Sequence, residues 1–96
     1  MLTKSQLQTI YYLYQAGCLN INGFSEDVFP QDGIVGKGLR SSFKSLIRKG
    51  YFHLQKGRMA SGYNGKLMPV YIEDARVIAE FNQYTMIHGF DGLEYA

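Results

Sequence analysis

The sequence contains little cysteine, little proline and no long apolar run. Cys18 is the single cysteine among 96 residues, so no internal disulfide can form, and we expect a reducing compartment, the cytoplasm. No run approaches the roughly 18 apolar residues of a membrane span, and residues 1–6 lack the apolar block of a secretory signal. We therefore expect no membrane partner.

Residues that could carry catalysis or bind a metal are also scarce. Cys18, His53 and His88 do not have the spacing of a metal site. The acidic pairs at residues 26–27 and 73–74 are explained by helix starts, where the helix dipole favours carboxylates. Since no nucleophile, base and oxyanion-binding group come together, we expect no enzyme, no catalytic residue, no metal and no cofactor.

Aromatic residues are abundant along the chain, and positive charge is concentrated in one segment. Eight Tyr and six Phe provide enough large side chains for one small core. We expect one domain over residues 1–89 and a short, loose acidic tail over residues 90–96.

The charges are strongly segregated along the chain. Residues 33–72 hold eight of the ten basic residues and none of the eight acidic ones, which gives this segment +8 and the flanks together −6. The basic residues of this segment are Lys37, Arg40, Lys44, Arg48, Lys49, Lys56, Arg58 and Lys66. A polyanion would relieve their mutual repulsion. A solvated basic face without a partner remains the alternative.

The first 30 residues predict two helical segments. Residues 4–16 show an apolar stripe at helical spacing, with Thr3 as N-cap and Gly17 as the left-handed end. Residues 18–21 form either a short strand or a connection. Residues 25–29 predict a very short helix, because Pro30 disfavours the helical conformation of the residue before it.

The clearest helix covers residues 35–49 and ends at Gly50. Its apolar side is formed by Leu39, Phe43, Leu46 and Ile47. At about 100° per residue, four basic residues fall within roughly 80° on the opposite side. This predicted basic stripe consists of Lys37, Arg40, Lys44 and Arg48, bordered by Ser41 and Ser45.

A hairpin and a last helix follow. Residues 51–56 and 67–72 predict two strands around a glycine-rich loop at residues 57–66, in which Asn64 and Gly65 favour a tight turn. Pro69 confines its strand to an edge. Residues 73–88 predict a helix ending at Gly89, with a wide apolar face formed by Val77, Ile78, Phe81, Tyr84 and Thr85.

Residues 39–52 (LRSSFKSLIRKGYF) and, more weakly, residues 71–76 (YIEDAR) carry a resemblance to a known superfamily. The chain resembles the winged helix-turn-helix superfamily of small MarR- and PadR-like regulators. The resemblance implies an α+β fold with a three-helix core, a β-hairpin wing and a C-terminal helix. Two departures are Pro30, which shortens the second helix, and the glycines at 33, 36 and 38, which crowd the start of the basic helix.

On this reading the basic helix enters the major groove of double-stranded DNA. We expect Arg40 and Lys44 to contact base edges, with Ser41 and Ser45 permitting close approach, and Lys37 and Arg48 to contact phosphates. The resemblance places Arg58 and Lys66, which flank the hairpin tip, on the adjacent backbone or minor groove. Tyr63 is either a base-stacking residue or a plain turn aromatic.

The leading hypothesis is a transcriptional regulator that binds double-stranded DNA as a homodimer through its C-terminal helix. The alternative is a small phage- or plasmid-type winged-helix protein whose partner is a host protein, such as a polymerase subunit or a defence factor. RNA binding or non-specific architectural binding is a third. Alternatively, the apolar face of the last helix covers only the core of its own chain.

Overall fold

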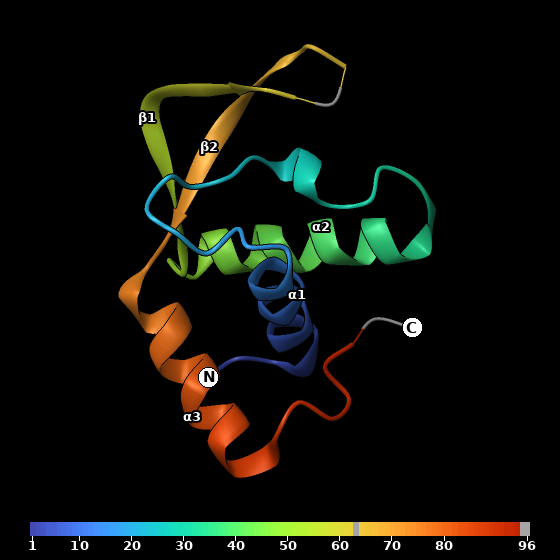
Figure 1. Cartoon of the computed structure of the whole chain (residues 1–96), viewed down its shortest axis with the longest axis vertical. Helices are drawn as coiled ribbons and strands as arrows, with labels where there is room; N and C mark the ends of the chain where they lie inside the picture. Colours follow the sequence, from blue (N-terminus) through green and yellow to red (C-terminus); the bar gives the residue numbers. More distant parts are fainter. Residues whose placement is uncertain (63, 95–96) are drawn as a thin grey trace.

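The described part of the chain contains three α-helices and one β-hairpin, which makes the fold α+β as predicted (Figure 1). The computed structural model describes residues 1–62 and 64–94, so Tyr63 and the expectation attached to it lie outside the described residues. In chain order the elements are α1 (Lys4–Gln15), the 3-10 turn η1 (Glu26–Val28), α2 (Gly33–Arg48), β1 (Phe52–Ser61), β2 (Leu67–Glu73) and α3 (Ala75–His88). This arrangement is compatible with a winged helix.

The helix ends follow the local signals of the sequence. The Thr3 hydroxyl accepts a hydrogen bond from the backbone N–H of Gln6 (3.2 Å), and the Gln6 side chain accepts one from the N–H of Thr3 (2.9 Å). This capping box satisfies two N–H groups that the helix leaves free. Gly17, Gly50 and Gly89 follow the three helices with positive φ of 72°, 81° and 68°, a conformation that favours glycine.

The segment between α1 and α2 is mostly irregular. Residues 18–21 form the connection rather than a strand, because the Asn20 side chain accepts from Asn22 N–H and donates to the Gly17 carbonyl, both at 2.8 Å. Strand-like pairing occurs at Phe24, which exchanges two backbone hydrogen bonds with Tyr71 of β2. The predicted short helix is the single turn η1, and α2 begins two residues before the predicted start at 35.

The hairpin differs from the prediction in its first strand. Leu54 pairs with Tyr71 and Met59 pairs with Pro69, so residues 55–58 bulge out opposite a single residue of β2. Pairing resumes at Met59, and β1 therefore reaches Ser61 instead of ending at residue 56. The predicted loop at 57–66 is wrong for residues 57–61, since the bulge bends the strand without ending it. Figure 1 shows this bend as a corner in β1.

Phe43, on the inner side of α2, is the centre of the core. Its ring lies 5.2–5.4 Å, centroid to centroid, from the rings of Phe24, Phe29, Phe52 and Tyr71. These neighbours come from the connection, β1 and β2, so one buried side chain joins α2 to all of them. The outer side of α2 is thereby fixed toward solvent.

The C-terminal segment folds back onto α1. Leu93 is 1% exposed, the Phe90 ring stacks on Tyr11 at 5.5 Å, and the Gln8 side-chain amide donates to the Gly92 carbonyl at 3.1 Å. The expectation of a domain ending at residue 89 with a loose tail is therefore wrong for residues 90–93. The acidic composition of this segment concealed one apolar anchor, Leu93.

Candidate functional site

The outer side of α2 carries an exposed basic ridge. Lys37, Ser41, Lys44 and Arg48 are all exposed, and they recur every three or four residues along the helix, which places them on one face. We refer to these four residues as the basic ridge. They are the part of the predicted stripe that the structure leaves open to a partner.

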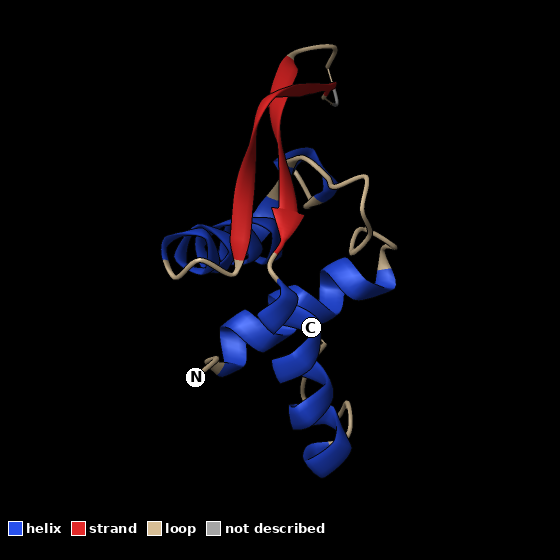
Figure 2. Cartoon of the chain, turned by 90° about the vertical axis from the view of Figure 1, so that its left-hand side faces the viewer, coloured by secondary structure: helices blue, strands red, loops and turns tan. Residues whose placement is uncertain are grey.

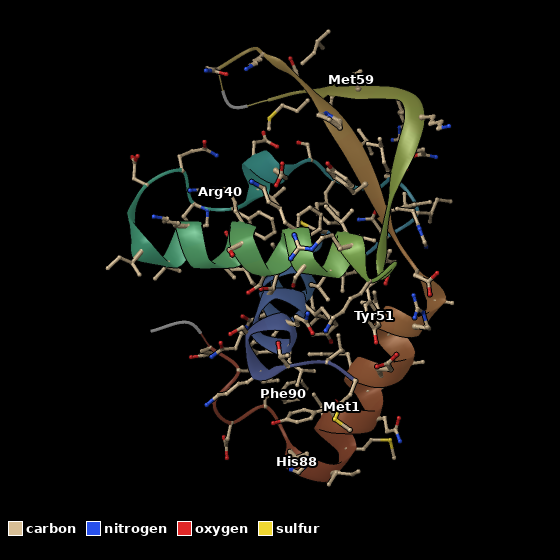
Figure 3. All side chains as sticks on the ribbon, turned by 180° about the vertical axis from the view of Figure 1, so that it is seen from behind. Met1, Arg40, Tyr51, Met59, His88 and Phe90 are labelled. Atoms are coloured by element: carbon tan, nitrogen blue, oxygen red, sulfur yellow. The ribbon has the colours of Figure 1, made fainter. Side chains whose placement is uncertain are left out.

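Arg40 has a different environment from the basic ridge. It is half-buried, and its guanidinium donates to the backbone carbonyls of Pro30 and of Gln31, the latter at 3.5 Å (Figure 3). The loop can approach α2 this closely because residue 36 is glycine: a Cβ there would collide with the Pro30 carbonyl oxygen. Arg40 therefore fastens the preceding loop to α2, whereas the sequence pattern placed it at a base edge.

Ser45 also lies away from the basic ridge. Its hydroxyl donates to the Ser42 carbonyl at 2.7 Å and accepts from the side-chain amide of Gln6 at 3.0 Å. Gln6 is buried on α1, so Ser45 lies at the contact between α1 and α2. We expected Ser45 to permit the close approach of a partner, but its hydroxyl is engaged within the chain. The contact with Gln6, 39 residues away, has no signal in the local sequence pattern.

The hairpin supplies a second group of cations. Arg58 and Lys66 are exposed, as the prediction requires, and Lys56 joins them in the bulge. The Arg58 guanidinium donates to the Gln55 side-chain oxygen at 2.9 Å, which braces the bulge. The prediction omitted Lys56, although its place in the acid-free segment was a sufficient signal.

A polar network joins the end of α2 to β1 and α3. Arg76 donates to the Gly50 carbonyl at 2.8 Å and to the Asp74 carboxylate at 2.9 Å, and its guanidinium lies 4.5 Å from the centre of the Tyr51 ring. The Tyr51 hydroxyl donates to the Glu80 carboxylate at 2.8 Å. These contacts fix the end of α2 relative to the hairpin and α3.

Two pKa values in this network are shifted by its contacts. The hydrogen bond from His53 at 2.7 Å, followed by those from the backbone and side chain of Arg76, holds the pKa of Asp74 well below its ordinary value. Burial, and then the hydrogen bond to Glu80, raises the pKa of Tyr51. Both shifts are caused by contacts within this network.

The cations of the basic ridge and the hairpin have no carboxylate partner in the part of the chain that the structure describes. The two ion pairs within residues 1–62 and 64–94 both involve Asp74, with His53 and Arg76. Unpaired positive charge is therefore concentrated on α2 and the hairpin, where it raises the local concentration of anions.

The described residues contain no group of three His, Cys, Asp or Glu side chains that could hold a metal ion. Within the same residues, no helix combines the length and the apolar character needed to cross a membrane.

Some apolar residues of α3 are buried in the core, whereas others are exposed to solvent. Val77 and Phe81 are buried in the core, and Ile78, Tyr84 and Thr85 are half-buried, so none of the five residues of the predicted face is exposed. Met86 is 86% exposed and Ile87 is 71% exposed. A groove of about 440 Å³ lies between α3 and the N-terminal segment. Its lining consists of Met1, Leu2, Leu7, Glu80, Gln83, Tyr84, Ile87 and His88.

Comparison of this chain with protein-family models, with curated proteins and with solved structures finds no match.

Proposed function

We propose that this chain is a winged helix-turn-helix domain that binds double-stranded DNA and regulates transcription, with the basic ridge of α2 in the major groove. The observation that carries the proposal is that Lys37, Lys44 and Arg48 share one exposed helix face without a described carboxylate partner. The element order, with a hairpin directly after this helix, supports the proposal. The free, buried Cys18 is in keeping with a cytoplasmic, non-catalytic protein.

The dimensions of α2 suggest how the basic ridge is divided. At 1.5 Å per residue, Lys37 and Arg48 lie about 16 Å apart along the helix, and the major groove is about 12 Å wide. Ser41 and Lys44, in the middle, are therefore the residues we assign to base edges. Lys37 and Arg48, at the ends, are assigned to phosphates on either side of the groove.

The hairpin cations complete the interface. Lys56, Arg58 and Lys66 are exposed on an element that follows α2 directly, and we assign them to phosphates of an adjacent segment. Phosphate contacts supply affinity and no sequence information. Specificity must then come mainly from Ser41 and Lys44.

Fluorescence anisotropy across a salt series tests this proposal. With the five cations assigned to phosphates, the slope of log K against log salt should be about −4.5 for mixed-sequence duplex DNA. Replacing Lys37 and Lys44 together by alanine should weaken binding strongly and reduce the slope by about one, because only Lys37 of the two is assigned to a phosphate. Lys4→Ala, which removes an exposed cation on α1, is the control and should bind like the wild type.

Weak binding that the double variant leaves unchanged would contradict DNA recognition by α2. A partner protein captured by the wild type after nuclease treatment, and lost in the double variant, would instead favour the protein-binding alternative.

We further propose that two copies associate through the exposed end of α3. Met86 and Ile87 are exposed there, and the other exposed residues of α3 beyond Arg76 are Ala79, Asn82, Gln83 and His88. Figure 2 shows α3 extending away from the rest of the chain, opposite the hairpin. Equilibrium sedimentation at tens of micromolar should show a dimer that Met86→Ser with Ile87→Ser dissociates. A monomeric wild type would contradict this association.

A further inference from the structure

The far end of the hairpin exposes two large apolar side chains. Met59 is 53% exposed and Leu67 is 64% exposed. Met59 pairs with Pro69, and Ser61 pairs with Leu67. Because cross-strand partners and residues two apart share a face, Met59, Leu67 and Pro69 lie on one face of the hairpin. Figure 3 shows Met59 at the end of the hairpin farthest from α3.

The backbone of this end is held in a defined shape. The Gly62 N–H donates to the Lys66 carbonyl at 2.7 Å, and the Gly65 N–H donates to the Gly62 carbonyl at 3.0 Å. At the other side of the apolar pair, the contact of Arg58 with Gln55 braces the bulge. Backbone and side-chain hydrogen bonds therefore flank the two apolar side chains on both sides.

The charges around the apolar pair favour a nucleic acid over a protein as its partner. Arg58 directly precedes Met59, Lys66 directly precedes Leu67, and no acidic residue occurs from residue 33 to residue 72. Protein–protein interfaces are depleted in lysine but enriched in arginine and methionine, so the residue types alone do not decide the partner. The uniformly positive charge does, because cations on both sides of an apolar pair suit a base stack between two phosphate backbones. Met, Leu and Pro are among the residues that minor-groove proteins insert between base steps.

We propose that Met59 and Leu67 form a wedge that enters the minor groove, partly unstacks one base step and bends the DNA toward the major groove. Arg58 and Lys66 hold the phosphates on the two sides of the wedge. This inference rests on the proposed DNA binding and adds a deformation of the duplex to it. A basic ridge in the major groove would not by itself require such a deformation.

The test measures bending and unstacking separately from affinity. A 30-base-pair mixed-sequence duplex carries a donor and an acceptor dye at its ends, and a second duplex carries 2-aminopurine as a reporter of unstacking. The wedge variant replaces Met59 and Leu67 by serine. The control replaces Ile21 and Leu54, two other exposed apolar residues, by serine. Thermal melting by circular dichroism verifies that both variants are folded.

Wild type and control should raise the energy transfer and the 2-aminopurine fluorescence, and the wedge variant should raise neither. The wedge variant should bind about tenfold more weakly. The free energy gained by burying two apolar side chains exceeds the cost of unstacking one base step by about this factor. Its slope of log K against log salt should equal that of the wild type, because no cation is removed.

Equal bending by the wedge variant, or DNA that stays straight with every protein, would overturn the wedge while leaving DNA binding intact. Failure of the proposed function has a different signature: no DNA binding by the wild type, or none that depends on Lys37 and Lys44. That result would overturn both proposals.

Discussion

Replacing Phe43 by alanine removes the ring that four other aromatic rings surround. Phe43 is fully buried, and Phe→Ala changes at such positions typically cost 3–5 kcal/mol. We expect about 4 kcal/mol here, because neighbours on three different segments cannot all collapse into the cavity together. A chain of this length has a total stability of about 5–14 kcal/mol, so the loss takes a large part of it.

Urea unfolding followed by circular dichroism measures this loss. With an m-value near 1.5 kcal/mol/M, the midpoint should fall by about 2–3 M. Phe90→Ala is the matched control: its ring is half-exposed and stacks on Tyr11, so we expect a loss of about 1 kcal/mol. If the two variants lose stability equally, Phe43 is not the centre of the core. Phe43→Leu should retain DNA binding, since the basic ridge lies on the other side of α2.

Three further predictions concern the contacts around α2 and α3. Gly36→Ala should destabilise the protein by about 1–3 kcal/mol in urea unfolding, because the added Cβ meets the preceding loop; a stabilised variant, as helix propensity alone would give, would contradict that contact. His53 holds the pKa of Asp74 low, so the stabilisation is present above the unfolded pKa near 4 and is lost as the pH falls through the folded value. Stability measured from pH 6 to pH 2 should therefore fall less steeply in Asp74→Asn, and identical slopes would refute the pairing. Tyr51→Phe should cost about 1.5–3 kcal/mol, since it removes a buried hydrogen bond to a carboxylate; a double-mutant cycle with Glu80→Gln that shows no coupling would exclude this bond.

Much of the fold could be predicted because local signals decide it. Thr3 starts α1 through its own side chain, and Gly50 and Gly89 end α2 and α3 by adopting a conformation that other residues avoid. The apolar periodicity of α2 identified Phe43 as an inward residue, and the inward face determines the outward one. The exposed positions of the basic ridge follow from the same periodicity.

Features that depend on distant partners could not be predicted in this way. Ser45 and Arg40 lie close to the basic ridge in helical angle, but their side chains form hydrogen bonds with Gln6 and with the Pro30 carbonyl. The bulge in β1 could not be told from a loop, because glycine is equally typical of both. Leu93 is a single apolar residue among acids, and its burial depends on packing against core residues that are distant in the sequence.

The return of the C-terminal segment onto α1 has a practical consequence for handling the protein. A fragment cut after Gly89 would lose Leu93 from the core and uncover the ring of Tyr11, so it would be prone to aggregate although it keeps every helix and strand. Met1, by contrast, is fully exposed. Affinity tags and surface tethers therefore belong at the N-terminus, and the shortest fragment to express should extend through residue 94.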